Sequence, residues 1–149
     1  MTEVDWRFRP ATAQDAPWMA ELRAEVMRPD LERLGRFDER RVRERFLIAY
    51  VPAHTRVIVA DGRDAGLVAL RPDGDALWVE HFYLSPQVQG RGIGGQVLAA
   101  IRAEHPAAML RLYVLQGSPA RRLYERSGFV LEGEDPVDVY MAAAPQRAS

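Results

Sequence analysis

The fold of this 149-residue chain is decided by the stretch Trp78-Val79-Glu80-His81-Phe82-Tyr83-Leu84-Ser85-Pro86-Gln87-Val88-Gln89-Gly90-Arg91-Gly92-Ile93-Gly94-Gly95. The stretch passes from a strand pattern through a glycine loop into a helix. The first N–H groups of such a helix have no intrahelical partners, and the helix dipole adds about half a positive charge at the same end. The loop therefore predicts a site for a phosphate group.

Two separate motifs resemble those of the GNAT superfamily of acyl-CoA N-acyltransferases. The glycine loop, Gln89 to Gly94, fits the central signature of that family: Gln or Arg, two residues, Gly, one residue, then Gly or Ala. The segment Ser118 to Phe129 has the family's later spacing of Ala, Leu-Tyr and Gly-Phe, here Ala120, Leu123-Tyr124 and Gly128-Phe129. Their order along the chain also agrees with the family.

Two other classes of phosphate-binding loop fit this sequence less well. Gly90, Gly92 and Gly95 have the G-x-G-x-x-G spacing of a dinucleotide site. That loop follows the first strand of its fold and needs an acidic residue about 20 positions later, whereas this loop begins past the middle of the chain and the next strand, 109–115, ends without a carboxylate. A nucleoside-triphosphate loop is excluded because it needs a lysine, and all 20 basic residues are arginine.

Composition narrows the classes of partner and of chemistry. A net charge of −1 gives no bulk attraction to nucleic acid or to an anionic membrane, so the expected partner is a small molecule. The absence of cysteine excludes disulfides, thiolate metal sites and a cysteine nucleophile, and the three histidines have no metal-ligand spacing, so no metal is expected. With no signal-like or membrane-spanning stretch, a cytoplasmic protein is predicted. A homodimer is left open.

Hydrophobic periodicity predicts a single domain, 1–149, with the element order β-α-α-β-β-β-α-β-α-β-β. The resemblance implies the same succession: an α/β (α+β) fold with a mixed, mostly antiparallel sheet of about seven strands flanked by four helices. A break is expected at 27–37, around Pro29 and Gly35, and the tail after about 142 is predicted to be disordered. Strands are predicted at 6–9, 55–60, 65–71, 76–85, 109–115, 129–131 and 137–141, and helices after the capping-box-like residues 12–15 and at 38–50, 93–105 and 118–127.

The resemblance implies acetyl-CoA as co-substrate. In the family, the strand before the glycine loop and the strand after its helix splay apart, and the pantetheine arm lies between them. Arg91 would add positive charge near the phosphates, and Arg121 or Arg122 would reach the nucleotide. Gly117 departs from the family, which often has asparagine there, and this puts one cofactor contact in doubt. The expected cofactor-binding residues are Phe82, Tyr83 and Leu84 for the pantetheine arm and Gln89, Gly90, Arg91, Gly92, Ile93, Gly94 and Gly95 for the pyrophosphate.

Acyl transfer to an amine poses two proton-transfer problems, because the ammonium must lose a proton and the departing thiolate must gain one. By resemblance, Tyr124 is the general acid, and Glu80, on the strand before the loop, is the candidate base. A backbone N–H near residues 82–84 would polarise the thioester carbonyl. The simpler alternatives are that Tyr124 is a core aromatic and that Glu80 is a surface residue or an ion-pair partner.

The predicted function is acetyl-CoA-dependent N-acetylation of a primary amine of a small molecule or peptide, by direct transfer in a ternary complex. The competing hypotheses are a noncatalytic acyl-CoA-binding module on the same fold and, more remotely, a dinucleotide-dependent oxidoreductase. Acceptor choice is assigned to segment 27–37 and to the acidic segment near 132–138, which predict a polycationic or amino-acid-like amine unless these charges are only solvated. The residues concerned are Arg28, Arg33, Arg36, Glu132, Glu134, Asp135 and Asp138.

Overall fold

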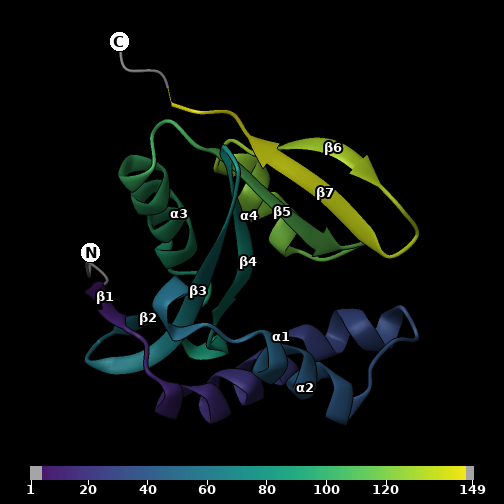
Figure 1. Cartoon of the computed structure of the whole chain (residues 1–149). Coiled ribbons are helices and arrows are strands. Elements are labelled where there is room, and N and C mark those ends of the chain that lie inside the picture. The colour runs from purple at the N-terminus through teal and green to yellow at the C-terminus, as the bar shows by residue number, and fades with distance from the viewer. Residues whose placement is uncertain (1–4, 147–149) are drawn as a thin grey trace. The chain divides into compact units, whose positions relative to one another are not determined.

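The computed structural model describes residues 5–146 and has the predicted fold (Figure 1). Seven strands pair in the order β1-β2-β3-β4-β5-β7-β6. The strands are β1 (Trp6–Pro10), β2 (Thr55–Ala60), β3 (Arg63–Asp73), β4 (Ala76–Leu84), β5 (Met109–Leu115), β6 (Val130–Glu134) and β7 (Asp138–Ala143). The helices are α1 (Ala16–Arg33), α2 (Glu39–Ala49), α3 (Ile93–Glu104) and α4 (Ala120–Arg126), with short 3-10 turns at Ala13–Asp15, Pro52–His54 and Pro86–Val88.

Strand direction follows the lengths of the connections. The pairs β1/β2, β2/β3, β5/β7 and β6/β7 are antiparallel, whereas β4 and β5 are parallel because α3 lies between them in the chain. The parallel ladder runs from Ala76 opposite Met109 to Trp78 opposite Arg111. The prediction of a mostly antiparallel mixed sheet with four helices is therefore confirmed.

The chain forms two compact units, and each is made of discontinuous segments. The first unit contains residues up to Ala69 together with His81–Arg91, and the second contains Leu70–Glu80 together with the chain from Gly92 onward. In the first unit, α1 and α2 share a core with β2 and β3, in which Met19, Phe46 and Leu67 are fully buried. In the second, α3 and α4 are in contact, and β5 lies between the parallel strand β4 and the antiparallel strand β7.

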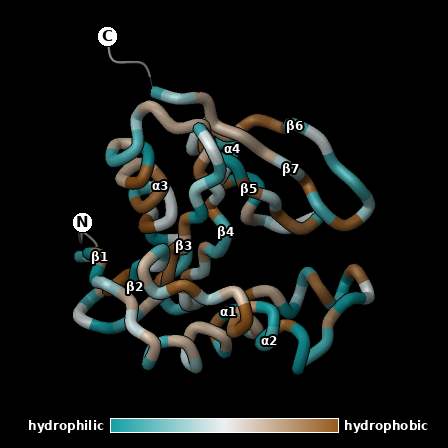
Figure 2. Tube along the Cα trace, viewed as in Figure 1, coloured by the Kyte–Doolittle hydropathy of each residue, from teal (hydrophilic) through white to brown (hydrophobic). Residues whose placement is uncertain are grey.

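Alternation along the strands of the second unit separates a buried face from an open one. Leu110, Leu112 and Val114 of β5 are buried, whereas Tyr113 between them is 56% exposed. Helix α3 supplies Val97, Leu98 and Ile101 to the core. Figure 2 shows hydrophobic stretches along α3 and a hydrophilic turn between β6 and β7. In this unit, one face of the sheet is therefore buried in the core, and the other face carries exposed side chains.

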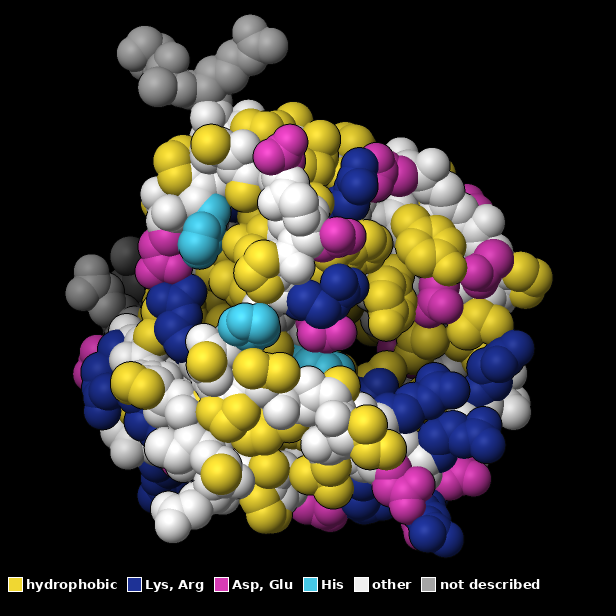
Figure 3. Space-filling model, in the orientation of Figure 1, with side chains coloured by type: hydrophobic (Ala, Val, Ile, Leu, Met, Phe, Trp, Pro, Cys, Tyr) yellow, Lys and Arg dark blue, Asp and Glu magenta, His cyan; other side chains and the backbone are white. Residues whose placement is uncertain are grey.

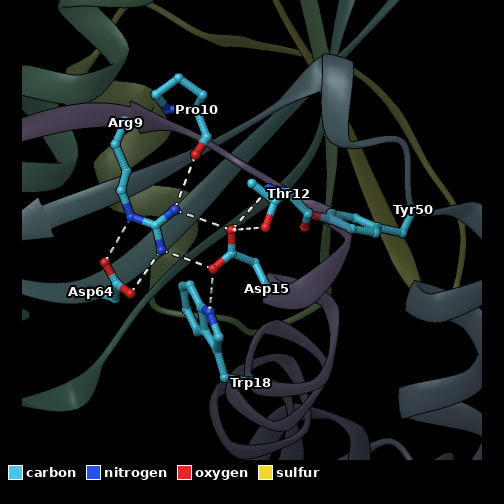
Figure 4. A network of polar contacts seen from close by, with 7 residues as sticks. All are labelled: Arg9, Pro10, Thr12, Asp15, Trp18, Tyr50 and Asp64. Carbon is cyan, nitrogen blue, oxygen red and sulfur yellow. Dashed lines mark hydrogen bonds and ion pairs between the residues drawn. The ribbon is translucent and has the colours of Figure 1, made fainter.

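A buried polar network fixes the start of α1 in the first unit (Figure 4). Asp15 accepts hydrogen bonds from the backbone N–H of Thr12 (2.9 Å), from Trp18 Nε1 (2.8 Å) and from both terminal nitrogens of Arg9 (2.8 and 3.1 Å). The other edge of the Arg9 guanidinium binds Asp64. The capping-box spacing at 12–15 predicts this local geometry, and the structure confirms it.

Several predicted boundaries are wrong for local reasons. The break expected at 27–37 starts later, because α1 continues through Pro29 to Arg33, and the pairs Arg28–Glu32 and Asp30–Arg33 stabilise its last turns. Helix α4 is capped by Pro119 and not by Ser118, although Ser118 Oγ still accepts the N–H of Ala120 at 3.2 Å. The last two strands are longer than predicted. Strand β7 reaches Ala143, one residue beyond the expected start of the tail, and 147–149 lie outside the described residues.

Candidate active site

The N-terminus of α3, in the second unit, has the geometry of an anion receptor. Gly92 precedes the helix with φ of 82°, a left-handed conformation that glycine adopts without the strain of a side chain. The first helical bond joins the N–H of Gln96 to the carbonyl of Gly92 at 3.2 Å, so the N–H groups of Ile93, Gly94 and Gly95 have no partner within the helix. A Cβ added at Gly92 would meet no atom within 4 Å, so there is open space at this position.

A groove of about 490 Å³ continues from this helix end along α3 and α4. Its floor on α3 is made of small residues, because Gly92, Gly95 and Ala99 leave the helix backbone accessible. Arg126 on the α4 side is exposed and has no ion-pair partner among the described residues. The groove is lined by Gly92, Gly95, Ala99, Arg102, Leu123, Arg126, Ser127, Gly128 and Gln146. The groove therefore offers backbone N–H groups at one end and a free cation on its wall, which suits a phosphate-bearing chain.

The other arginines near the grooves differ in how far they are already paired. Arg102 donates to the carbonyls of Ser127 and Ala144, both at 3.1 Å, so it ties the end of α4 and the chain after β7 to α3. Arg121, the predicted nucleotide contact, pairs with Glu125 at 3.4 Å. A second groove of about 370 Å³ at the start of α4 is lined by Gly117, Ser118, Pro119, Arg121, Arg122 and Glu125.

The residues before α3, in the first unit, are held by their own contacts. Gln89 Nε2 donates to the carbonyl of Leu84 at 2.8 Å, which fixes the loop to the end of β4. Arg91 pairs with Asp61 at 2.8 Å, so its guanidinium is engaged in the turn between β2 and β3. Position 66 of β3 must be glycine because the backbone of β4 passes close to it. A Cβ there would lie 2.4 Å from the carbonyl oxygen of Tyr83. Phe82, Tyr83 and Leu84 are half-buried at this end of β4.

Tyr124, the predicted acid, lies on α4 and is 8% exposed. Its ring packs edge-on against Phe129, with centroids 5.8 Å apart, and its carbonyl accepts the N–H of Phe129 at 3.0 Å. The Leu-Tyr and Gly-Phe parts of the motif thus contact one another, since Gly128, with φ of 97°, turns the chain back after the helix. Tyr124 is part of the core as well as a candidate acid.

Glu80, the predicted base, is half-buried on β4 in the second unit. Its Oε1 lies 3.3 Å from Nε of Arg71, and the two side chains are 31% and 46% exposed. The Arg71 guanidinium also lies over the Trp78 ring, 5.6 Å from its centroid. The alternative interpretation of Glu80 as an ion-pair partner is therefore realised in this structure, although a single exposed contact of this kind is weak.

His81, next to Glu80 in sequence but in the first unit, is a polar residue that the sequence did not single out for function. Its Nδ1 lies 2.9 Å from the hydroxyl of Tyr83, which accepts a hydrogen bond from Arg23 Nε, and its ring packs on Phe46. Its Nε2 is buried and has no hydrogen-bond partner among the residues that the structure describes. Burial, with a smaller effect of the positive charge of Arg23, lowers the pKa of His81 to about 4, so the imidazole is neutral near pH 7.

The residues expected to choose the acceptor are mostly engaged. Arg28 pairs with Glu32 and stacks on Phe37, and Arg33 pairs with Asp30. In the acidic segment of the second unit, Glu132 pairs with Arg111 at 3.3 Å, Glu134 accepts from Gln116, and Asp135 caps the turn by accepting the N–H groups of Val137 and Asp138.

Sequence reasoning missed Arg126 and Arg71. A surface arginine on a short helix or at a strand end carries no pattern that marks it. Among residues 5–146, no group of three or more His, Cys, Asp or Glu side chains could hold a metal ion. The helices within the same range are all too short or too polar to cross a membrane.

Comparison with known proteins identifies the family. The model of the acetyltransferase (GNAT) domain matches residues 52–131. Among solved structures, the PaiA N-acetyltransferase from Thermoplasma acidophilum in complex with coenzyme A is 20% identical, with a TM-score of 0.76 over 94% of this chain and 99% of that one. The ribosomal-protein-S18-alanine N-acetyltransferase from Escherichia coli is 17% identical, with a TM-score of 0.69 over 97% of each chain.

At these identities the structural matches show the fold alone. No curated protein sequence gives a significant match. The family model, however, covers more than half of the chain and includes the glycine loop, the α3–α4 groove as far as Gly128, and Tyr124. The chain therefore belongs to the GNAT family of N-acetyltransferases, enzymes that take their acetyl group from acetyl-CoA.

Proposed function

We propose that this protein transfers the acetyl group of acetyl-CoA to a primary amine of a small molecule, by direct transfer in a ternary complex. The observation that carries the proposal is the N-terminus of α3 with the groove that continues from it. The N–H groups without an intrahelical partner, a left-handed glycine with open space beside it, and Arg126, which has no ion-pair partner among residues 5–146, fit the phosphates of coenzyme A. The relative from T. acidophilum, with the same fold, was solved in complex with coenzyme A.

The chain's own groups have separable roles in this proposal. The N–H groups of residues 93–95 hold the pyrophosphate, and the backbone of residues 82–84 pairs with the pantetheine arm. The carbonyl of Leu84 is already engaged by Gln89, so part of this pairing is left to Phe82 and Tyr83. Acetyl-CoA supplies an acetyl group activated as a thioester.

Two residues handle the protons. Glu80 takes a proton from the acceptor ammonium, directly or through water, so that the amine lone pair becomes available. Tyr124 donates the proton that the departing thiolate needs. Neither step requires a covalent bond to the protein, which agrees with a chain that has no cysteine.

The proposal is tested by screening primary amines with acetyl-CoA and measuring release of coenzyme A. Direct transfer predicts intersecting initial-rate lines when both substrates are varied, whereas a covalent enzyme intermediate predicts parallel ones. Tyr124→Phe should lower kcat by about 10²-fold or more without changing cofactor affinity. Tyr50→Phe, which removes a hydroxyl bound to the carbonyl of Thr12, is the control and should retain turnover. Tight binding of coenzyme A without turnover of any amine would instead indicate a noncatalytic module.

A further inference from the structure

Three aromatic rings form a row across neighbouring strands of the second unit. Trp78 of β4 is opposite Arg111 of β5 in the ladder, and Tyr113 of β5 is opposite Tyr140 of β7, so all three rings lie on the face away from buried Leu110 and Leu112. The Trp78 and Tyr113 centroids are 6.4 Å apart, and those of Tyr113 and Tyr140 are 6.1 Å apart. We call Trp78, Tyr113 and Tyr140 the aromatic platform.

Carboxylates hold both ends of the platform in place. Trp78 Nε1 donates to Asp73 at 3.3 Å, and the Tyr140 hydroxyl donates to Asp135 at 2.9 Å. Asp135 is itself fixed by two backbone N–H groups of the β6–β7 turn. Tyr113, between these anchored rings, is 56% exposed. The two outer rings are thus held in place, and the central ring is accessible to a ligand.

The charge around the platform favours a cation. Figure 3 shows acidic side chains around exposed hydrophobic ones in the region of β6 and β7. Two arginines, Arg71 and Arg111, stand against five carboxylates, which gives a local excess of three negative charges. The five carboxylates belong to Asp73, Glu80, Glu132, Asp135 and Asp138. Aromatic rings with an anionic surround bind organic cations through the negative faces of their π systems.

Arg71 already makes the contacts that such a cation would make. Its guanidinium lies over Trp78 at 5.6 Å and against the Glu80 carboxylate at 3.3 Å. Both interactions are weak, because the Arg71 side chain is 46% exposed and the Glu80 contact is single rather than bidentate. A competing cation can therefore displace Arg71 at small cost.

We propose that the aromatic platform binds the cationic body of the acceptor, and that Arg71 occupies the place of the acceptor's ammonium group until the acceptor displaces it. The acceptor class is then an organic polycation, an amine that carries at least one further ammonium group for Tyr113 and Tyr140. This inference rests on the proposed function, in which Glu80 is the base. An amino-acid-like acceptor is disfavoured, because its carboxylate would meet the same negative excess.

The first experiment compares Arg71→Gln with Arg111→Gln, using 1,4-diaminobutane and butylamine as acceptors. Arg71→Gln removes the internal competitor, so the KM for the diamine should fall about two- to five-fold. Arg111→Gln removes the same charge from the same face, but Arg111 pairs with Glu132 instead of Glu80, so the KM should change by less. An increase of KM in Arg71→Gln, or equal decreases in both variants, would overturn the proposal.

The second experiment measures binding without catalysis. Tetramethylammonium, titrated against sodium chloride at constant ionic strength and without acetyl-CoA, should quench tryptophan fluorescence in the wild type and in Trp6→Phe but not in Trp78→Phe. If no amine is acetylated but this quenching occurs, the platform stands and the proposed function fails. If amines are acetylated while Trp78 does not respond and Trp78→Leu keeps the wild-type KM, the platform proposal fails and the function stands.

Discussion

Asp15 and Glu80 each pair with an arginine, but burial gives the two carboxylates different roles. Asp15 is 7% exposed and accepts five hydrogen bonds, from Arg9, Thr12 and Trp18. Glu80 has a 31% exposed side chain and one contact with Arg71. A carboxylate with every acceptor site filled is structural, whereas one with a single weak partner remains available to a substrate.

Asp15→Asn should lower the free energy of unfolding by about 3 kcal/mol at pH 7, because the amide cannot accept from all these donors and the Arg9 charge loses its buried partner. Urea denaturation measures the change. Asp64→Asn, on the other edge of the same guanidinium with a 43% exposed side chain, is the matched control and should cost less than about 1 kcal/mol. Equal losses in the two variants would contradict a special role for Asp15.

Asp15 should also make the stability of the protein depend on pH. Hydrogen bonds from Arg9 first, and then from Trp18 and Thr12, hold the pKa of Asp15 well below its usual range despite burial. The unfolded chain therefore binds this proton first, and the stabilisation by Asp15 is complete above about pH 4 and is lost as the pH falls through the lower folded value. The difference in unfolding free energy between wild type and Asp15→Asn should shrink below pH 4.

Glu80→Gln should lower kcat by about 10²-fold or more where the acceptor is protonated, because the amide cannot take the proton. The defect should diminish as the pH rises toward the pKa of the acceptor amine, where the lone pair is already free. Rates of wild type and variant across this pH range give the measurement. A constant ratio of the two rates would exclude Glu80 as the base.

At the scale of elements, the sequence predicts best where one local rule acts alone. Strand β2 and strand β5 have the predicted bounds, because each is a short apolar run between turns. The end of α1 is missed because proline usually ends a helix, and here ion pairs along the last turns carry the helix past Pro29. The glycine loop can be predicted because phosphate binding there requires glycine. The roles of Arg71 and Arg126 depend on residues that are distant in the sequence, so the sequence pattern does not reveal them.

The arginines of α4 give a direct comparison of sequence and structure. Arg126 lines the α3–α4 groove and has no ion-pair partner in the described part of the chain, whereas Arg121 is engaged by Glu125. Arg126→Gln should weaken binding of coenzyme A by about five-fold, equivalent to about 1 kcal/mol, because a charge-assisted contact with a phosphate is lost. Arg121→Gln should have a smaller effect. Calorimetric titration of both variants with coenzyme A measures the two affinities. A larger loss of affinity in Arg121→Gln would favour Arg121 as the nucleotide contact, as predicted from the sequence.

For the whole molecule, a net charge of −1 conceals a strongly uneven distribution. The platform face has an excess of carboxylates, whereas the α3–α4 groove presents free N–H groups and an arginine. Bulk electrostatics therefore attracts neither an anionic cofactor nor a cationic acceptor, and each must be recognised by its own local site. Salt should consequently weaken both interactions, since each depends on exposed charges.

Binding of acetyl-CoA should stabilise the native chain as a whole, because the unfolded chain has neither the α3 terminus nor the groove. At a hundred-fold excess over Kd, the added stability is about 2.7 kcal/mol, which corresponds to an increase of about 5–10 °C in Tm for a domain of this size. NAD⁺ at the same concentration is the control, and it should leave Tm unchanged because the chain has no acidic residue where a dinucleotide site needs one. Arg126→Gln should reduce the shift with acetyl-CoA at a fixed concentration. A larger shift with NAD⁺ than with acetyl-CoA would return the glycine loop to the dinucleotide alternative.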